Sequence, residues 1–191
     1  GYAGMAAAVA LARNGVRVTV YEAARRLGGR ARAVVHRERI LDNGQHILIG
    51  AYRETLALIG EAGAGADALL RLPLRWTVLP DFDLRAARLP APWHLAVGLL
   101  RAKGLGPAAR IGCVQFVAWA QRAHFRLERD VTVAELLQRH RQHPAAIACL
   151  WDPLCVAALN TVTAEASAQV FLNVLRDGLA SRRDASDVLL P

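Results

Sequence analysis

The order of elements over the first 23 residues limits what this chain can fold into more than any other feature. Residues 1–4, GYAG, directly precede residues 5–12, a run of strong helix formers that ends near Asn14-Gly15, a pair typical of a left-handed helix cap. In residues 16–23, VRVTVYEA, three valines alternate with other side chains, which predicts a strand. A glycine turn, a helix and a strand in this order predict an α/β, Rossmann-like fold.

Glu22 closes the predicted strand and lies 18 residues after Gly4. If a strand and one more glycine precede Gly1, then Gly1 and Gly4 are the last two glycines of a G-x-G-x-x-G turn. One of them lets the backbone approach a pyrophosphate at the positive end of a helix, and Glu22 accepts hydrogen bonds from ribose hydroxyls. Glycines at a helix start can also serve turn geometry alone. The order of glycine turn, helix, strand and terminal acidic residue nevertheless favours a dinucleotide site.

The length and composition fit a globular chain. Its 191 residues suffice for one domain or a domain with part of another, and 54% of them are hydrophobic against 21% charged. The chain starts at Gly1 without a methionine and stops just after Val188-Leu189-Leu190, so we expect a piece of a longer protein. The net charge of +8 comes from scattered arginines and the single Lys103, so we expect no nucleic-acid partner.

A second glycine cluster follows Glu22, because residues 26–31 read RLGGRA. A chain that binds only NAD has no evident need for such a stretch, whereas a flavin enzyme must hold a longer cofactor along its extended length. Arg30, directly after Gly28-Gly29, would fork onto phosphate oxygens, although an ordinary surface arginine is common in this chain. The two glycine clusters together favour a flavin dinucleotide.

Five polar or turn-forming residues, 42–46, interrupt an aliphatic stretch that resumes at Ile47. Residues 33–41 are predicted to be extended, and Asn43-Gly44 could make a hairpin turn, with Gln45 and His46 satisfied by neighbouring groups. Alternatively, these polar groups face a cofactor ring, where backbone N–H groups tune its electron affinity. The residues alone leave both interpretations open.

The remainder of the chain is predicted to be mostly helical. Helices are expected over residues 52–63, 93–103, 107–124 and 164–177, the last ending before Gly178, and prolines punctuate a strand-and-loop region over residues 70–92. Thr132 and Glu135 have the spacing of a capping box. We therefore expect a cofactor-binding part over residues 1–70 and a mostly helical part over residues 71–191 that continues beyond the chain end.

Cysteine and histidine spacing gives no sign of a metal site. The three cysteines have no CxxC spacing and are predicted to be free, mostly buried thiols in a reducing compartment: Cys113, Cys149 and Cys155. His140 and His143 could share one face of a helix, which we interpret as a solvated face because further ligands are missing nearby.

Three other side chains each allow more than one role. Asp152, between Trp151 and Pro153, could cap a helix, make a buried polar contact or serve as an acid beside a substrate, and capping is the preferred interpretation. Phe116 and Trp119 lie on a long apolar helix, where core packing is expected, although a lipid tunnel would use the same residues.

Three stretches resemble a known family. The residues around Glu22 and Arg26 to Ala31, ExxxRLGGRA, resemble the FAD-binding segment of the amine oxidase and phytoene desaturase superfamily. DNGQHILIGAYRETL, residues 42–56, and LWDPLCVAALNT, residues 150–161, resemble the hydroxysqualene dehydroxylases, also called squalene-associated FAD-dependent desaturases. The resemblance runs along nearly all of the chain and covers only the front portion of such a protein.

The resemblance implies FAD as cofactor and hydroxysqualene, an isoprenoid lipid, as the substrate that is reduced to squalene on the route to hopanoids. It places the turn at residues 44–47 along the flavin and makes His46 a candidate acid, or a group that only positions the flavin. The implied cofactor-binding residues are Gly1, Ala3, Gly4, Glu22, Ala23, Gly29, Arg30, Gly44, Gln45, His46 and Ile47.

Two alternatives stay open at this point: a related carotenoid desaturase or amine oxidase, and a non-catalytic nucleotide- or lipid-binding module. We expect a cytoplasmic protein, and weak attraction to an acidic inner-membrane surface stays open. We expect these 191 residues alone to bind flavin poorly and to be inactive, because the resemblance places parts of the flavin site outside them.

Overall fold

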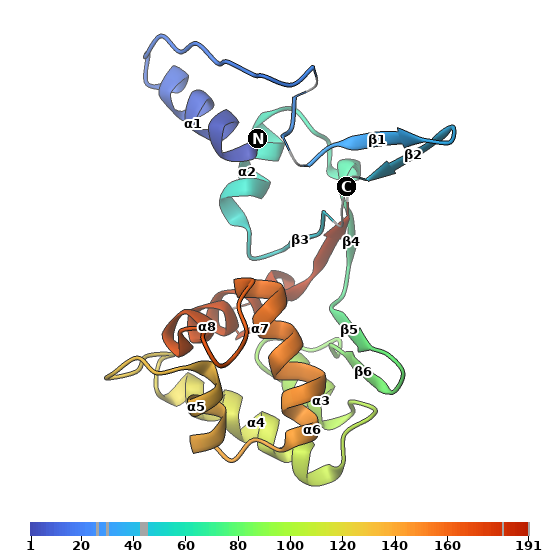
Figure 1. Ribbon diagram of the computed structural model, residues 1–191, viewed down its shortest axis with the longest axis vertical. Helices are drawn as coiled ribbons and strands as arrows, with labels where there is room; N and C mark the ends of the chain where they lie inside the picture. The colour runs from blue at the N-terminus through green and yellow to red at the C-terminus, as the bar shows by residue number, and fades with distance from the viewer. Residues whose placement is uncertain (26, 30, 43–45, 181, 191) are drawn as a thin grey trace. The chain divides into compact units, whose positions relative to one another are not determined.

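The computed structural model describes residues 1–25, 27–29, 31–42, 46–180 and 182–190 (Figure 1). The chain divides into two compact units, which are treated separately below. The first unit holds Gly1–Leu48, Arg53–Leu70 and Leu190, and the second holds Ile49–Tyr52 and Arg71–Leu189. The assignment of cofactor binding to residues 1–70 stays a prediction.

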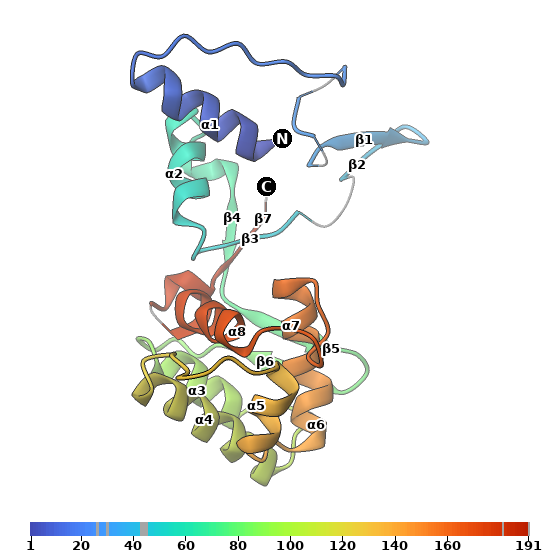
Figure 2. The same ribbon diagram turned by 60° about the vertical axis from the view of Figure 1, so that its left-hand side comes forward.

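The first unit contains two paired helices, which lie side by side in Figure 2. Helix α1, Tyr2–Arg13, ends at Asn14, and Gly15 adopts the left-handed φ of +75° that the sequence predicts for the cap. Helix α2, Arg53–Glu61, is somewhat shorter than the predicted 52–63. Arg13 Nη1 donates to Glu61 Oε1 at 2.7 Å and links the two helices.

The predicted strand over residues 16–23 is wrong, because the structure gives this segment no strand conformation. A strand is held by hydrogen bonds to a neighbouring strand, and no described residue pairs with this segment in a ladder. Alternation of valines is therefore insufficient for a strand without a hydrogen-bonded partner. The Rossmann-like arrangement stays an expectation, while the observed fold mixes helices with short strands.

Residues 33–42 form a hairpin where the sequence predicted one extended segment. Strands β1, Ala33–His36, and β2, Arg39–Asp42, pair antiparallel, with Val34 opposite Leu41. The two turn residues between them, Arg37 and Glu38, both have positive φ, as the tight turns of hairpins require. The turn thus falls before Asn43-Gly44, and these two residues lie outside the described part of the chain.

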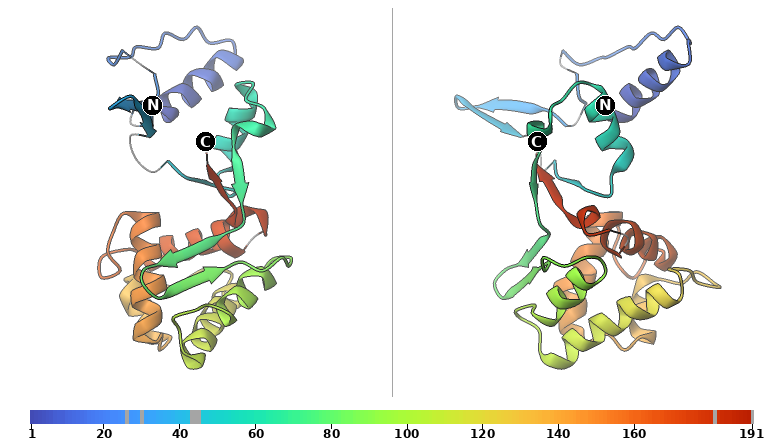
Figure 3. Two further views of the ribbon diagram at one scale, coloured as in Figure 1. Left: turned by 90° about the vertical axis from the view of Figure 1, so that its right-hand side faces the viewer. Right: turned by 180° about the vertical axis from the view of Figure 1, so that it is seen from behind.

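A three-stranded sheet has the order β3, Leu48–Ile49, then β7, Val188–Leu190, then β4, Leu70–Leu72. A short 3₁₀ helix, η1, Ala66–Ala68, precedes β4. Strands β5, Arg75–Val78, and β6, Phe82–Arg85, follow as a separate antiparallel pair (Figure 3), in agreement with the predicted strand-and-loop region.

The rest of the second unit is helical, as predicted. Helices α3 and α4 begin at the predicted Trp93 and Pro107, and the Thr132 hydroxyl caps α5 by accepting from the Glu135 N–H at 3.1 Å. The helical elements of the second unit are α3 Trp93–Leu100, α4 Pro107–Arg122, α5 Val133–Arg139, α6 Pro144–Ala146, η2 Ile147–Trp151, α7 Asp152–Leu159, α8 Ala168–Val174, η3 Leu175–Ala180 and η4 Asp184–Ser186.

One expectation about a helix end is wrong. The predicted stop at Gly178 is passed, since α8 widens into the π-helical turn η3, which runs to Ala180. Pro144 and Pro153 lie in the first turns of α6 and α7, and the π-helical turn η2 directly precedes α7. No described helix has both the length and the apolar character needed to cross a membrane.

The core of the second unit packs side chains from α3, α4, α5, α7, α8 and strand β6. Both Cys113 and Cys155 are buried free thiols, as predicted, and burial raises the pKa of Cys113 to about 12. Cys149 is half-buried. The largest fully buried side chains are Trp151, Phe82, Phe116, Phe171, Leu136, Leu137, Leu172, His94 and Val133.

Asp83 on β6 holds the β5–β6 hairpin through three donors. Its carboxylate accepts from Arg75 and Arg85 at 2.8 Å each and from the Thr77 hydroxyl at 2.9 Å. The hydrogen bond from Arg75 is the largest influence, and together these donors lower the pKa of Asp83 from 3.8 to about 2 although burial opposes them.

This lowered pKa predicts acid-sensitive stability. Because the folded pKa is depressed, the carboxylate stabilises the fold above pH 3.8 and loses that contribution as the pH falls toward 2. We expect Asp83→Asn to lower the urea midpoint at pH 6 and the gap to the unaltered protein to close by pH 2. An Asp81→Asn control on the same hairpin should show no such closing gap. A gap for Asp83→Asn that persists at pH 2 would contradict the prediction.

Candidate functional site

The two glycine clusters of the first unit lie against each other at the start of α1. Gly28 and Gly29 both have left-handed φ values, +111° and +64°. A Cβ atom on Gly29 would lie 3.1 Å from the Cα of Gly1, and one on Gly28 would lie 2.6 Å from the Ala31 carbonyl oxygen. The left-handed φ values disfavour a side chain at both positions, and at Gly29 a side chain would also crowd Gly1. The structure thus brings together two motifs that the sequence assigned to one cofactor.

The start of α1 suits an anion. Gly1 is the N-cap residue without a side-chain cap, and the first turn, which includes Ala3 and Gly4, carries no acidic residue. The first N–H groups of a helix have no intrahelical acceptor and form its positive end. An uncapped helix end beside glycines fits the pyrophosphate of a dinucleotide, so Gly1, Ala3, Gly4 and Gly29 would hold that group.

The structure places Glu22 and Ala23 on exposed, irregular chain. One Glu22 carboxylate oxygen accepts from the Ala24 N–H at 2.9 Å. Within the described residues, no hydrogen bond joins Glu22 to the glycine clusters, so the ribose-binding role of Glu22 and the role of Ala23 stay predictions. Arg30, the predicted phosphate ligand, lies outside the described residues.

His46 is held by Asp42, a pairing that the sequence analysis missed. The His46 ring Nδ1 lies 2.5 Å from Asp42 Oδ1, and the His46 N–H donates to Asp42 Oδ2 at 3.1 Å. A carboxylate at one ring nitrogen fixes the orientation of an imidazole, as in many acid–base sites. The sequence signal for this pairing was the position of Asp42 four residues before His46 in DNGQH. Ile47 follows on irregular chain, while Gly44 and Gln45 lie outside the described residues.

The second unit contains an apolar cavity of about 190 Å³. Strands β5 and β6, helices α3, α4 and α7, and the π-helical segments all contribute to its wall. Gln121 and Ser186 are polar residues of the lining, and Tyr52, Trp76 and Trp151 are its aromatic residues. The apolar lining residues are Ile49, Leu74, Leu84, Pro92, Leu95, Leu99, Val117, Leu150, Leu154, Ala157, Ala158, Val174, Leu175, Gly178 and Leu179.

The aromatic side chains of α4 take the core role that the sequence favoured. Phe116 is buried, and its ring stacks on Trp119 at a centroid distance of 5.7 Å. Neither residue lines the cavity, so the alternative of a tunnel lined by them is not seen. Val117 and Gln121 are the residues of α4 that line the cavity instead.

The interpretation of His140 and His143 as one solvated helix face is wrong. His140 ends α5, and its ring lies 3.8 Å from that of Trp119, where burial lowers its pKa. His143 begins the next helix, since its Nδ1 accepts from the Ala145 N–H at 3.1 Å. Across the described residues, no cluster of three His, Cys, Asp or Glu side chains could hold a metal.

Asp152 makes a polar contact and not the preferred helix cap. Its Oδ1 accepts from the Thr163 hydroxyl at 2.8 Å, while Trp151 is the N-cap residue of α7. Asp152 does not line the cavity. The carboxylate therefore ties α7 to the loop before α8, and the contact with a residue eleven positions away was not readable from the WDP sequence.

The glycine contact and the apolar cavity are features expected of flavin-containing oxidoreductases. Residues 2–179 match the family described as flavin containing amine oxidoreductase. The chain belongs to this family. Membership confirms the resemblance to the amine oxidase superfamily and implies a flavin cofactor.

A curated relative supports the finer resemblance. The hydroxysqualene dehydroxylase of Zymomonas mobilis subsp. mobilis is 28% identical over 189 residues, an alignment that covers 94% of this chain. The same alignment covers 42% of the relative, so this chain spans less than half of the length of that protein.

Proposed function

We propose that the full protein is an FAD-dependent enzyme that reduces hydroxysqualene to squalene. The observation that carries the proposal is the apolar cavity of the second unit, whose volume of about 190 Å³ and apolar wall suit one part of a hydrocarbon chain. The uncapped start of α1 beside Gly28 and Gly29 supports FAD as the flavin. The name of the Zymomonas mobilis relative supports the choice of substrate.

The chemistry divides between the flavin and the protein. When bound, reduced flavin would supply a hydride. The substrate hydroxyl would gain a proton and leave as water, and the delocalised allylic cation left on the substrate would take up the hydride to form a C–H bond. The apolar wall around Leu95, Leu150 and Leu175 keeps solvent away from that cation and holds the chain in one orientation.

The direct test is turnover by the full-length enzyme. Incubation with hydroxysqualene, FAD and a chemical reductant should yield squalene, measured by gas chromatography with mass spectrometry. Oxidation of amines or dehydrogenation of carotenoids, without squalene, would overturn the proposal in favour of a related oxidase or desaturase. Purified full-length protein that takes up no FAD would favour a non-catalytic module.

Blocking the cavity should slow turnover. Ala157 on α7 lines the cavity, whereas its neighbour Val156 is 46% exposed and does not. In the full-length enzyme we expect Ala157→Phe to lower kcat/KM for hydroxysqualene by about tenfold, because the added ring competes with substrate for space. Val156→Phe is the matched control and should change kcat/KM little. Equal effects of the two changes would show that this cavity does not bind the substrate.

A further inference from the structure

Ser186 brings a hydroxyl group to the wall of the mostly apolar cavity. It ends the short helix η4, is 2% exposed and lines the cavity. Its Oγ donates to the Arg183 carbonyl oxygen at 2.9 Å and lies 3.3 Å from the Nε2 of His94. A hydroxyl at this position is unexpected for a purely hydrocarbon pocket.

His94 lies behind Ser186 and is fully buried on α3. Burial is the main cause that lowers the pKa of His94, and the Arg183 cation adds to it while Asp187 opposes it. The imidazole is therefore neutral at neutral pH. Its Nδ1 has no hydrogen-bond partner among the described residues. A buried polar atom without a partner costs stability, which points to a role other than stability for this side chain.

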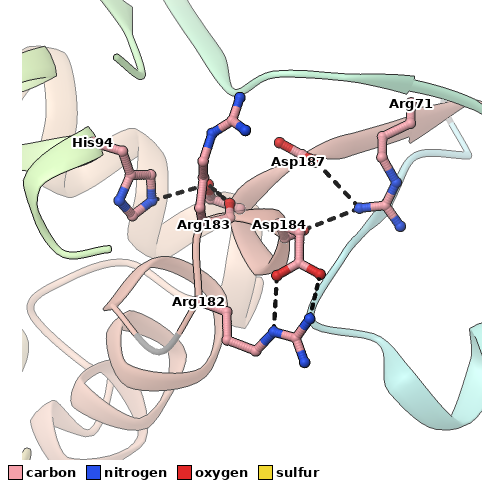
Figure 4. A network of polar contacts seen from close by, with 7 residues as sticks. Arg71, His94, Arg182, Arg183, Asp184 and Asp187 are labelled. Carbon is pink, nitrogen blue, oxygen red and sulfur yellow. Dashed lines mark hydrogen bonds and ion pairs between the residues drawn. The ribbon is translucent and has the colours of Figure 1, made fainter. Parts of the chain in front are cut away.

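The segment that carries Ser186 is anchored on both sides. Arg182 forms two hydrogen bonds with the Asp184 carboxylate, at 2.8 and 2.9 Å. Arg71 Nη1 lies 3.2 Å from the Asp184 carbonyl oxygen and 3.3 Å from Asp187 Oδ2 (Figure 4). These contacts hold the backbone around Ser186 in place, so its hydroxyl is oriented before any ligand arrives.

The hydrogen-bonding capacity of Ser186 is not exhausted by these contacts. A serine hydroxyl has one proton and two lone pairs. If the proton goes to the Arg183 carbonyl, then His94 Nε2–H donates to one lone pair and the other lone pair is left. If the proton goes to His94 instead, both lone pairs are left. In either arrangement the Ser186 oxygen can accept a hydrogen bond from a ligand in the cavity.

We propose that Ser186 determines specificity by accepting a hydrogen bond from the hydroxyl of an isoprenoid alcohol, and that His94 positions the Ser186 hydroxyl. The inference rests on the proposed function for the isoprenoid nature of the ligand. Beyond the proposed function, the inference names Ser186 as the residue that distinguishes an alcohol from a hydrocarbon of the same length. A squalene molecule in the same position makes no such hydrogen bond, so the pair favours substrate over product.

The test compares binding of hydroxysqualene and squalene to full-length protein, measured by displacement of a fluorescent apolar dye. We expect the unaltered protein to prefer the alcohol by roughly tenfold, the effect of one buried hydrogen bond. Ser186→Ala should abolish most of this preference by weakening alcohol binding alone. Ser167→Ala removes a hydroxyl that does not line the cavity and should leave the preference unchanged.

A pair of His94 variants tests its positioning role. Gln can present an amide N–H near the position of Nε2, whereas Phe fills the space without a donor. We expect His94→Gln to retain most of the alcohol preference and His94→Phe to lose it, while squalene binding changes little in either. Melting temperature and FAD retention identify any variant that fails to fold. If a His94 variant fails to fold, the alcohol preference of Ser186→Ala alone tests the inference.

The outcomes separate this inference from the proposed function. An unchanged alcohol preference in Ser186→Ala, or equal weakening of both ligands, would overturn the inference even if the enzyme makes squalene. Conversely, a Ser186-dependent preference in a protein that forms no squalene would keep the inference and overturn the proposed reaction.

Discussion

Replacing Gly50 with alanine is expected to destabilise the second unit by on the order of 3 kcal/mol, the upper range for forced overpacking. Gly50 lies against the backbone of η4, where a Cβ atom would come 1.8 Å from the Asp184 carbonyl oxygen and 3.1 Å from the Ala185 Cα. These neighbours are main-chain atoms and cannot rotate away as a side chain could. The segment must move as a whole.

Such a movement would break further contacts. The Gly50 N–H donates to the Asp187 carbonyl at 3.0 Å, and the Ala51 N–H donates to the Ala185 carbonyl at 2.9 Å. Both hydrogen bonds join residues 50–51 to the segment that carries Ser186. We therefore expect Gly50→Ala to lower the urea midpoint of the full-length protein and to weaken alcohol binding by the cavity.

Gly112→Ala in helix α4 is the matched control. A Cβ there would lie 3.8 Å from the Gln142 Nε2, an ordinary contact, and alanine favours a helix over glycine by up to about 1 kcal/mol. We expect this change to leave stability unchanged or to raise it. If Gly50→Ala is tolerated as well as Gly112→Ala, the close approach of η4 to Gly50 is wrong.

Replacing Trp151 with alanine is expected to cost about 4 kcal/mol, within the range for removal of a buried aromatic ring. Trp151 is 2% exposed, and its ring contacts Phe116 edge-on at a centroid distance of 5.2 Å. Its indole N–H donates to Gln142 Oε1 at 2.9 Å, and Gln142 in turn donates to the Gly112 carbonyl. Truncation leaves both a void and a buried amide oxygen without its donor.

Trp93→Ala is the control, because Trp93 is 64% exposed and its loss should cost less than about 1 kcal/mol. Urea unfolding followed by circular dichroism measures both variants without relying on tryptophan fluorescence. A cost for Trp151→Ala as small as that for Trp93→Ala would contradict the packing of η2 against α4.

The cofactor motifs were readable because they depend on local chain properties. Glycine and alanine patterns predicted helix α1, its cap at Gly15 and the second cluster at Gly28, although α1 begins at Tyr2 and not at the predicted Met5. The same reasoning failed for residues 16–23, because a strand depends on a partner elsewhere. It also failed for residues 33–42, since positive φ at Arg37 and Glu38 is rare for such side chains and gives no sequence signal.

The sequence by itself determined the family, the glycine-rich cofactor motifs, the helix starts at Trp93 and Pro107, and the cap at Thr132. Each of these depends on residues close together in the chain, where backbone propensity and capping act. Only the tertiary structure decided the apolar cavity, the Asp184 contact of Gly50 and the pairing of Ser186 with His94, which lie 92 residues apart. Such contacts form by packing between distant segments, and no local pattern encodes which segments will meet.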